Sequence, residues 1–165
     1  MTDALQVTVI PEGDKGTVRL EDRFDTDIAD VWSAITDPER TARWIAVVTG
    51  DFRVGGELQG SFTSNWQGPM KVEVCDAPNR LKLLSGAAGE QTVMEAVLTQ
   101  DGDGTRVVIE ERGLPIADAP YHAAGWHVHV QDLDTELAMR SRAPWEPRWR
   151  ELLPTYGIVS SSVSE

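Results

Sequence analysis

The spacing of hydrophobic positions changes near residue 118 of this 165-residue chain. Residues 17–112 contain several short stretches in which apolar and polar side chains alternate, as in strands with one buried face. In residues 118–142 apolar side chains instead recur every three or four positions, as on one side of a helix. The pattern therefore predicts an α+β domain in which a sheet precedes one long C-terminal helix.

This helix is expected to present a broad apolar side with Trp126 at its middle. Asp118 suits the N-cap position, and Pro120 suits the first turn, where its missing N–H is not needed. Gly125 destabilises a helix interior by about 1 kcal/mol relative to alanine, so it indicates a close backbone approach or an empty space beside the helix. The apolar side consists of Ala123, Trp126, Val130, Leu133 and Leu137.

Six or seven antiparallel strands and two short helices are expected before the long helix. The first strand covers residues 17–25, and the two helices lie between residues 26 and 45. The second of these helices begins at Asp37-Pro38, where proline takes the first helical position. The later strands are expected at residues 52–54, 57–64, 70–75, 81–83, 92–98 and 105–112.

The chain divides into a central domain and two flanking segments. Residues 1–16 are expected to form an N-terminal arm or an added edge strand, and residues 17–143 the domain itself. Residues 144–165 form a C-terminal extension that packs on the domain or on a partner. Trp145 and Trp149 lie four positions apart in it, so their rings are expected to stack, as a lid or as a homodimer contact.

The acidic composition excludes several classes of partner. The chain has 15 Lys and Arg against 27 Asp and Glu, a formal net charge of −12, so nucleic acid and anionic membrane surfaces repel it. No apolar run approaches the ~20 residues that a membrane span needs, which argues against membrane insertion. Cys75 is the only cysteine and the N-terminus has no signal-peptide pattern, so we expect a cytoplasmic protein.

The three histidines do not predict a metal site, although they are close in sequence. Helix geometry points His127 and His129 about 200° apart and separates His122 from His129 by ~10 Å along the axis. His129 is instead expected to line a cavity or to make a structural hydrogen bond. No GxSxG or P-loop motif is present, and no cofactor is expected.

The order of elements and three short pieces of sequence resemble a known family. The pieces are residues 31–38 (VWSAITDP), residues 51–56 (DFRVGG) and the pair Gly125-Trp126. Over residues 17–142 the chain resembles the START-like, helix-grip fold of the SRPBCC superfamily, in its branch named after the activator of heat-shock-protein ATPase. The resemblance implies a curved antiparallel sheet wrapped around the C-terminal helix, with an apolar cavity between them, as in small single-domain bacterial relatives. Asp22 departs from the pattern, because a basic residue is expected there.

Alternation along the strands and the helical period together predict which side chains face that cavity. The small residues Gly60, Ala96 and Gly125 lie where the helix is expected to cross the sheet, which favours a cavity over a filled core. The expected lining residues are Leu58, Phe62, Met70, Val72, Val74, Met94, Ala96, Val107, Ile109, Trp126, His129, Val130 and Leu133.

The expected function is therefore the binding of a small hydrophobic ligand, either aromatic or lipid, between the sheet and the helix. One alternative is an enzyme of the cyclase or aromatase type, in which Asp22, Glu111 or His129 acts as acid or base. A second alternative is an interaction module like the chaperone ATPase activator, which binds a chaperone through the outer sheet face and the tryptophans of the extension.

Overall fold

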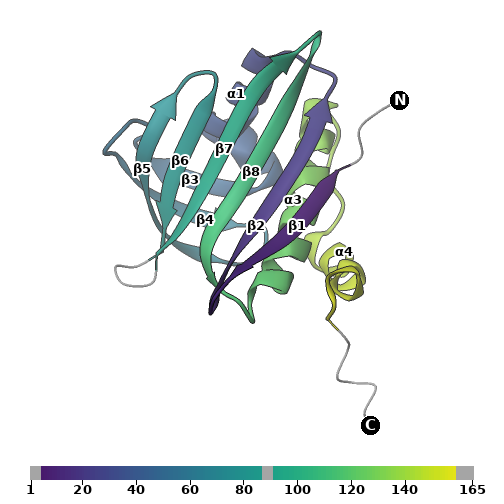
Figure 1. The fold of residues 1–165 in the computed structure, drawn as a ribbon. Coiled ribbons are helices and arrows are strands. Elements are labelled where there is room, and N and C mark those ends of the chain that lie inside the picture. Colours follow the sequence, from purple (N-terminus) through teal and green to yellow (C-terminus); the bar gives the residue numbers. More distant parts are fainter. Residues whose placement is uncertain (1–4, 87–90, 159–165) are drawn as a thin grey trace.

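One curved antiparallel sheet and a long helix on its concave side organise the molecule (Figure 1). The computed structural model describes residues 5–86 and 91–158. Its strands are β1 (Gln6–Glu12), β2 (Lys15–Phe24), β3 (Ala46–Gly50), β4 (Glu57–Phe62), β5 (Gln67–Asp76), β6 (Arg80–Ser85), β7 (Thr92–Asp101) and β8 (Gly104–Pro115). Its helices are α1 (Ile28–Thr36), α2 (Pro38–Trp44), α3 (Ala119–Leu137) and α4 (Trp145–Leu152), followed by the 3₁₀ turn η1 (Leu153–Tyr156).

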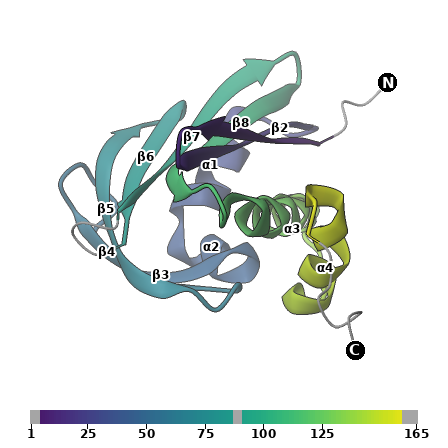
Figure 2. The same cartoon turned by 60° about the horizontal axis from the view of Figure 1, so that its bottom comes forward.

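The sheet order is β1-β2-β8-β7-β6-β5-β4-β3 over the described strands, and neighbouring strands are antiparallel. Helices α1 and α2 connect β2 to β3 at the far end of the sheet, and the chain then returns strand by strand to β8, which pairs with β2. Figure 2 shows the strands curving round a space in which α3 lies. The predicted α+β, helix-grip class is confirmed, with eight described strands where six or seven were expected.

The two short helices form where capping residues predict them. The Asp27 side chain accepts a hydrogen bond from the backbone N–H of Asp30 and so caps α1. Asp37 ends α1 and also caps α2, accepting from the N–H of Glu39, with Pro38 in the first turn. The helix pair is fixed by Trp44, whose indole N–H donates to the carbonyl of Ala34 at 2.8 Å.

Two strands differ from the sequence prediction. Residues 52–54 form a loop, and the strand of this region is β3, which follows α2 directly and alternates buried Ala46 and Val48 with exposed Val47. Residues 6–12 form β1, the edge-strand alternative, which pairs with β2 over the whole of its length. Both strands are short and lie at the two edges of the sheet, where alternation is the weakest guide to pairing.

A bulge in β5 changes which side chains face inward. Val72 pairs with Leu83, but the register then shifts, so that Cys75 pairs with Leu81. Cys75 therefore packs against the core, whereas Val74 was expected inside, and strict alternation along residues 70–75 then predicts Cys75 outside. Those two expectations are wrong, because one extra residue in a strand reverses the alternation beyond it.

Helix α3 ends at Leu137, five residues before the predicted end, and Met139 takes a positive φ of 59° just after it. Asp118 occupies the N-cap position but makes no side-chain capping hydrogen bond. The helix packs on β1 and β2 through its apolar side, and Glu136 near its end accepts hydrogen bonds from Arg40 and Arg43 of α2. None of the helices in the described part of the chain has the length and hydropathy that crossing a bilayer requires.

Candidate functional site

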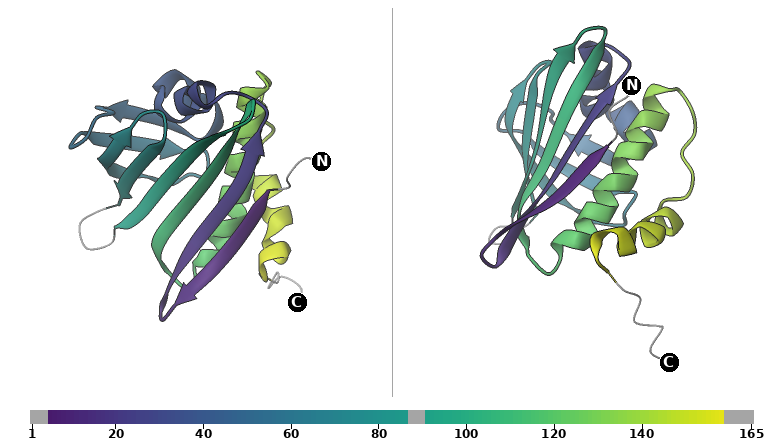
Figure 3. Two further views of the ribbon diagram at one scale, coloured as in Figure 1. Left: turned by 45° about the horizontal axis from the view of Figure 1, so that its top comes forward. Right: turned by 45° about the vertical axis from the view of Figure 1, so that its right-hand side comes forward.

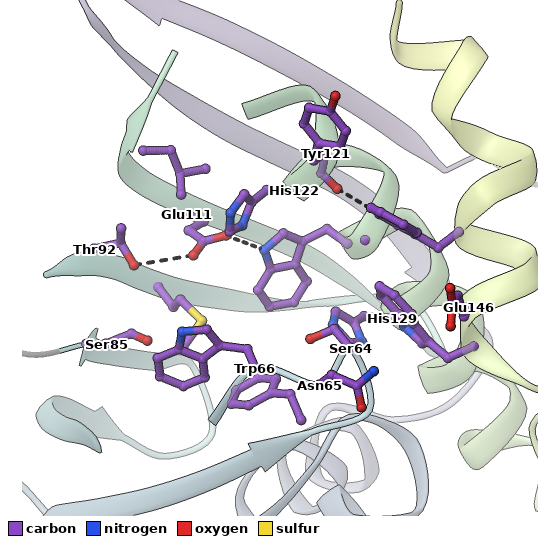
Figure 4. Close-up of a pocket in the computed structure, with 18 of the residues that line it drawn as sticks. Ser64, Asn65, Trp66, Ser85, Thr92, Glu111, Tyr121, His122, His129 and Glu146 are labelled. Atoms are coloured by element: carbon purple, nitrogen blue, oxygen red, sulfur yellow. Dashed lines mark hydrogen bonds and ion pairs between the residues drawn. The ribbon is translucent and has the colours of Figure 1, made fainter. Parts of the chain in front are cut away.

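A pocket of about 670 Å³ lies at the N-terminal half of α3, between that helix, the inner face of the sheet and α4 (Figure 4). It is bordered by the β4–β5 turn, by β6, β7 and β8, and by α3 and α4. Six of its nineteen lining residues are Phe, Trp or Tyr: Phe62, Trp66, Tyr121, Trp126, Trp145 and Trp149. Four of the six tryptophans of the chain therefore lie around one space.

The β4–β5 turn supplies one side of the wall. The rings of Phe62 and Trp66 meet edge to face, with centroids 5.4 Å apart and planes at 78°. Asn65 between them has a positive φ of 76°, a conformation that asparagine tolerates better than most residues and that allows the tight turn. The turn keeps Trp66 against the pocket although 39% of its surface is exposed.

Glu111 of β8 is the main polar group inside the pocket. It is buried, and its Oε1 accepts a hydrogen bond from the indole N–H of Trp126 at 2.9 Å. The same oxygen lies 3.2 Å from Nδ1 of His122, and Oε2 accepts from the hydroxyl of Thr92 at 3.3 Å. Figure 4 shows Glu111 between Thr92 and His122. The carboxylate thus connects the sheet to the first turns of α3.

His122 is held in a charged environment. Its burial would lower its pKa, but the hydrogen bond and the charge of Glu111, together with the charge of Asp118, outweigh burial and raise the pKa above 6.5. An imidazolium paired with a carboxylate is therefore populated near neutral pH.

His129 lies in a different environment two turns further along α3. Its ring is surrounded by aromatic rings, with centroids 5.4 Å from Trp126, 5.4 Å from Trp145 and 6.3 Å from Phe62. Burial, with smaller contributions from Arg142 and Arg148, lowers its pKa to about 3, so the imidazole is neutral. Its buried Nδ1 has no hydrogen-bond partner in the described part of the chain.

Helix α4 closes the pocket from the outside. Figure 3 shows that the chain turns back after α3, so that α4 lies beside the first half of that helix. The predicted stacking of Trp145 and Trp149 is confirmed, with centroids 5.9 Å apart and planes at 19°. The Trp149 N–H donates to the carbonyl of Tyr121 at 3.1 Å, and buried Trp145 places its N–H where no described group accepts it.

Gly125 lies where these indoles meet α3. A Cβ added at Gly125 would lie 3.5 Å from Cζ2 of Trp145 and 4.0 Å from Cδ1 of Trp149. Both distances are ordinary van der Waals contacts, so α4 packs directly over Gly125 but its approach does not by itself require a glycine there. Arg148 strengthens the approach, since its guanidinium donates to Oδ1 of buried Asp132 at 2.8 Å.

The structure brings only part of the predicted lining together. Phe62, Met94, Trp126 and His129 border the pocket. The remaining expected residues belong to the core or pack beside it, apart from Val74, which the bulge turns away: Leu58, Met70, Val72, Ala96, Val107, Ile109, Val130 and Leu133.

The second half of α3 meets the sheet without a cavity. Val130 and Leu133 pack against β2 and β8 around a recess that leaves no space for a water molecule. Over Gly60 the space is taken by the methyl end of Met70 and the ring of Phe62, both within 3 Å of where a Cβ would stand. Gly60, one of the small residues expected to leave room, is therefore covered by longer neighbours.

Of the three acid–base candidates, Glu111 and His129 border the pocket and Asp22 does not. Asp22 lies on β2 beside the closed recess, where its Oδ1 accepts the N–H of Arg23 at 2.8 Å. His122 was not among the site residues predicted from the sequence, although its position seven residues before His129 placed it on the same side of the helix. No cluster of three or more His, Cys, Asp or Glu suited to a metal occurs in residues 5–86 and 91–158.

A curved sheet gripping a C-terminal helix, with an aromatic pocket at their junction, defines a helix-grip protein of the SRPBCC type. Residues 25–138 match the family described as activator of Hsp90 ATPase homolog 1-like protein. The chain belongs to this family, as its sequence motifs predicted. A search of curated proteins finds no match.

Solved structures share the fold. CalU16 from Micromonospora echinospora is 25% identical, with a TM-score of 0.72 and 93% of each chain covered. DynU16, a protein from the dynemicin biosynthetic locus, is 23% identical, with a TM-score of 0.72 over 82% of this chain and 52% of its own. The protein encoded by gene BPP1335 of Bordetella parapertussis is 20% identical, with a TM-score of 0.71 and coverage of 92% and 90%.

Proposed function

We propose that this protein binds a flat aromatic small molecule in the pocket between the sheet, α3 and α4. The observation that carries the proposal is the gathering of Trp66, Trp126, Trp145 and Trp149 around a space of about 670 Å³. Ligand sites are typically apolar cavities of about 300–1,000 Å³ with a few polar groups, and aromatic walls favour ring stacking.

The charges around the pocket favour a neutral ligand. Glu111 and Glu146 are the carboxylates among its lining residues, and His129 is neutral there. Apart from His122, which is paired with Glu111, the described residues that line the pocket supply no cation, so an anionic ligand would meet carboxylates without a free matching charge. A carbonyl group on the ligand can accept a hydrogen bond from the protonated imidazole of His122, which borders the pocket.

Titration of the protein with the bicyclic aromatic ketone β-tetralone tests the proposed binding. We expect saturable quenching of the tryptophan fluorescence, because a ligand in the pocket contacts most of the tryptophans. The variant Met94→Trp places a larger side chain in the pocket and is expected to weaken binding at least tenfold, about 1.4 kcal/mol.

Val97→Trp is the matched control. Val97 lies on the same strand, β7, but its side chain is 40% exposed and borders no part of the pocket, so the added indole leaves binding unchanged. Equal affinities of the two variants would contradict the proposed site. An unsaturable signal in the wild type would contradict the proposed function.

A further inference from the structure

The contact between His122 and Glu111 has the geometry of an acid–base pair. Glu111 projects from β8 and is nearly covered, with 9% of its side chain exposed, while 42% of the His122 side chain is exposed. Because Nδ1 of His122 faces Oε1 of Glu111 at 3.2 Å, the other ring nitrogen, Nε2, is directed away from the carboxylate. His122 borders the pocket, and the described residues give Nε2 no hydrogen-bond partner.

We propose that His122 and Glu111 form a catalytic pair that moves a proton on the ligand bound in the pocket. The inference rests on the proposed function and names the ligand class more closely: a neutral aromatic ketone with a C–H bond next to its carbonyl group. The reaction is keto–enol isomerisation, which needs no oxidant, reductant or second substrate.

The proton transfer proceeds in two balanced steps. Nε2 of neutral His122 takes the proton from the carbon next to the carbonyl, and the C–H electron pair becomes the C=C bond of an enolate while charge moves to the carbonyl oxygen. The resulting imidazolium, held by the carboxylate of Glu111, then returns a proton to that oxygen and gives the enol. His122 is the catalytic residue and Glu111 the positioning residue, which holds the ring in one tautomer.

The surroundings of the pair favour this role over a purely structural tie. Trp126 and Thr92 already donate to Glu111, so the carboxylate is hydrogen-bonded without the histidine. The hydrogen bond and the charge of Glu111 raise the pKa of His122, so a proton taken by Nε2 is stabilised on the imidazole until it is returned.

Other ionisable groups near His122 are few. Asp118 stands one turn earlier on α3 and raises the pKa of His122, and His129 of the same helix is neutral. Glu146 of α4 borders the same pocket. The charge that contacts the imidazole directly is that of Glu111, so its removal is the informative change.

The test is hydrogen exchange of β-tetralone in deuterated buffer, followed by proton NMR, with binding measured in parallel by tryptophan quenching. The methylene between its aromatic ring and carbonyl exchanges its hydrogens when the ketone enolises. The wild-type protein is expected to accelerate exchange of the bound ketone, and His122→Gln to lower that rate by about 100-fold or more. For His122→Ala, added imidazole is expected to restore part of the rate, which a structural role does not predict.

His127→Gln is the matched control on the same helix. His127 contacts Tyr156 at 2.8 Å and does not border the pocket, so exchange is expected to stay at the wild-type rate. If β-tetralone binds and His122→Gln exchanges it as fast as the wild type, the catalytic pair is refuted while the binding function stands. If β-tetralone does not bind, both fail together.

The variant Glu111→Gln tests whether Glu111 acts on His122 through its charge or only through its packing. The amide still accepts a hydrogen bond from Trp126 but carries no charge, so the pKa of His122 falls. Because exchange needs neutral His122, the rate rises with pH through this pKa, and the midpoint of the profile moves to lower pH in the variant. If the pH profile of Glu111→Gln has the same midpoint as that of the wild type, the pairing of His122 with Glu111 is contradicted.

Discussion

At the scale of single residues, two histidines near the pocket have pKa values shifted in opposite directions. His122 and His129 lie seven positions apart on α3, yet a carboxylate raises the pKa of one and an aromatic enclosure lowers the pKa of the other to about 3. The helical period placed both on one side of the helix, and it identified Trp126 and His129 as lining residues. It carried no information on Glu111, whose distance to His122 depends on how α3 lies across β8.

The burial of His129 predicts that the stability of the protein depends on pH. Its pKa is about 3 in the folded protein and near 6.5 in the unfolded chain, so below pH 6.5 the unfolded state binds a proton that the folded state does not. Stability from this residue is complete above pH 6.5 and is lost as pH falls, by up to about 1.4 kcal/mol per pH unit.

Urea unfolding between pH 7 and pH 5 tests this by comparing the wild type with His129→Phe, which has no proton to bind. We expect the free energy of unfolding to fall more steeply with acidification in the wild type. Parallel curves would mean that the imidazole is accessible to protons in the folded state. Other titrating groups cancel in the comparison because they are common to both proteins.

At the scale of elements, α4 turns an open groove into a pocket. The sequence predicted that Trp145 and Trp149 stack, because four residues make about one helical turn. Where the stacked pair docks was left open between the domain and a partner, and in the structure it covers Gly125 of α3. The docking uses few polar contacts, and the pair between Arg148 and buried Asp132 is the main ionic one.

We predict that Arg148→Met destabilises the protein by about 3 kcal/mol, because Asp132 keeps a buried carboxylate without its cation. Burial already raises the pKa of Asp132 against the attraction of Arg148. Urea unfolding at pH 7 measures the loss. Arg150→Met is the control on the same helix, since its pair with Glu146 is exposed, and we expect a change within about 0.5 kcal/mol. Equal effects would show that Arg148 acts through packing alone.

At the scale of the whole molecule, α3 is fixed to the rest of the fold at both ends. Near its start, Glu111 of β8 holds Trp126 and His122. At its end, Glu136 accepts hydrogen bonds from Arg40 and Arg43 of α2, and these lower the pKa of its carboxyl despite the opposing effect of burial. The pocket lies at the first of these attachments, and between the two Val130 and Leu133 pack against the sheet without a cavity.

Glu136→Gln is predicted to destabilise the protein by about 2 kcal/mol at pH 7, since two guanidinium groups lose a carboxylate partner. The pKa of Glu136 is lowered on folding, so its contribution is present above the ordinary pKa of 4.5 and disappears as pH falls through the folded value. Urea unfolding of both proteins is expected to show that the difference in their free energies of unfolding is smaller at pH 3 than at pH 7. If this difference is the same at both pH values, the loss of stability comes from the shape of the side chain and not from its charge.

The sequence by itself determined the class of fold and the residues of the long helix that face the sheet. Periodicity and capping are local properties, so the short helices that Asp27 and Asp37 cap and the helix face around Trp126 can be predicted from residues nearby in the chain. The tertiary structure alone decided where space remains. A one-residue bulge turned Cys75 inward in place of Val74, Met70 filled the room above Gly60, and α4 enclosed the pocket from outside. Whether two surfaces pack solidly depends on the contact of side chains distant in sequence, which no local pattern records.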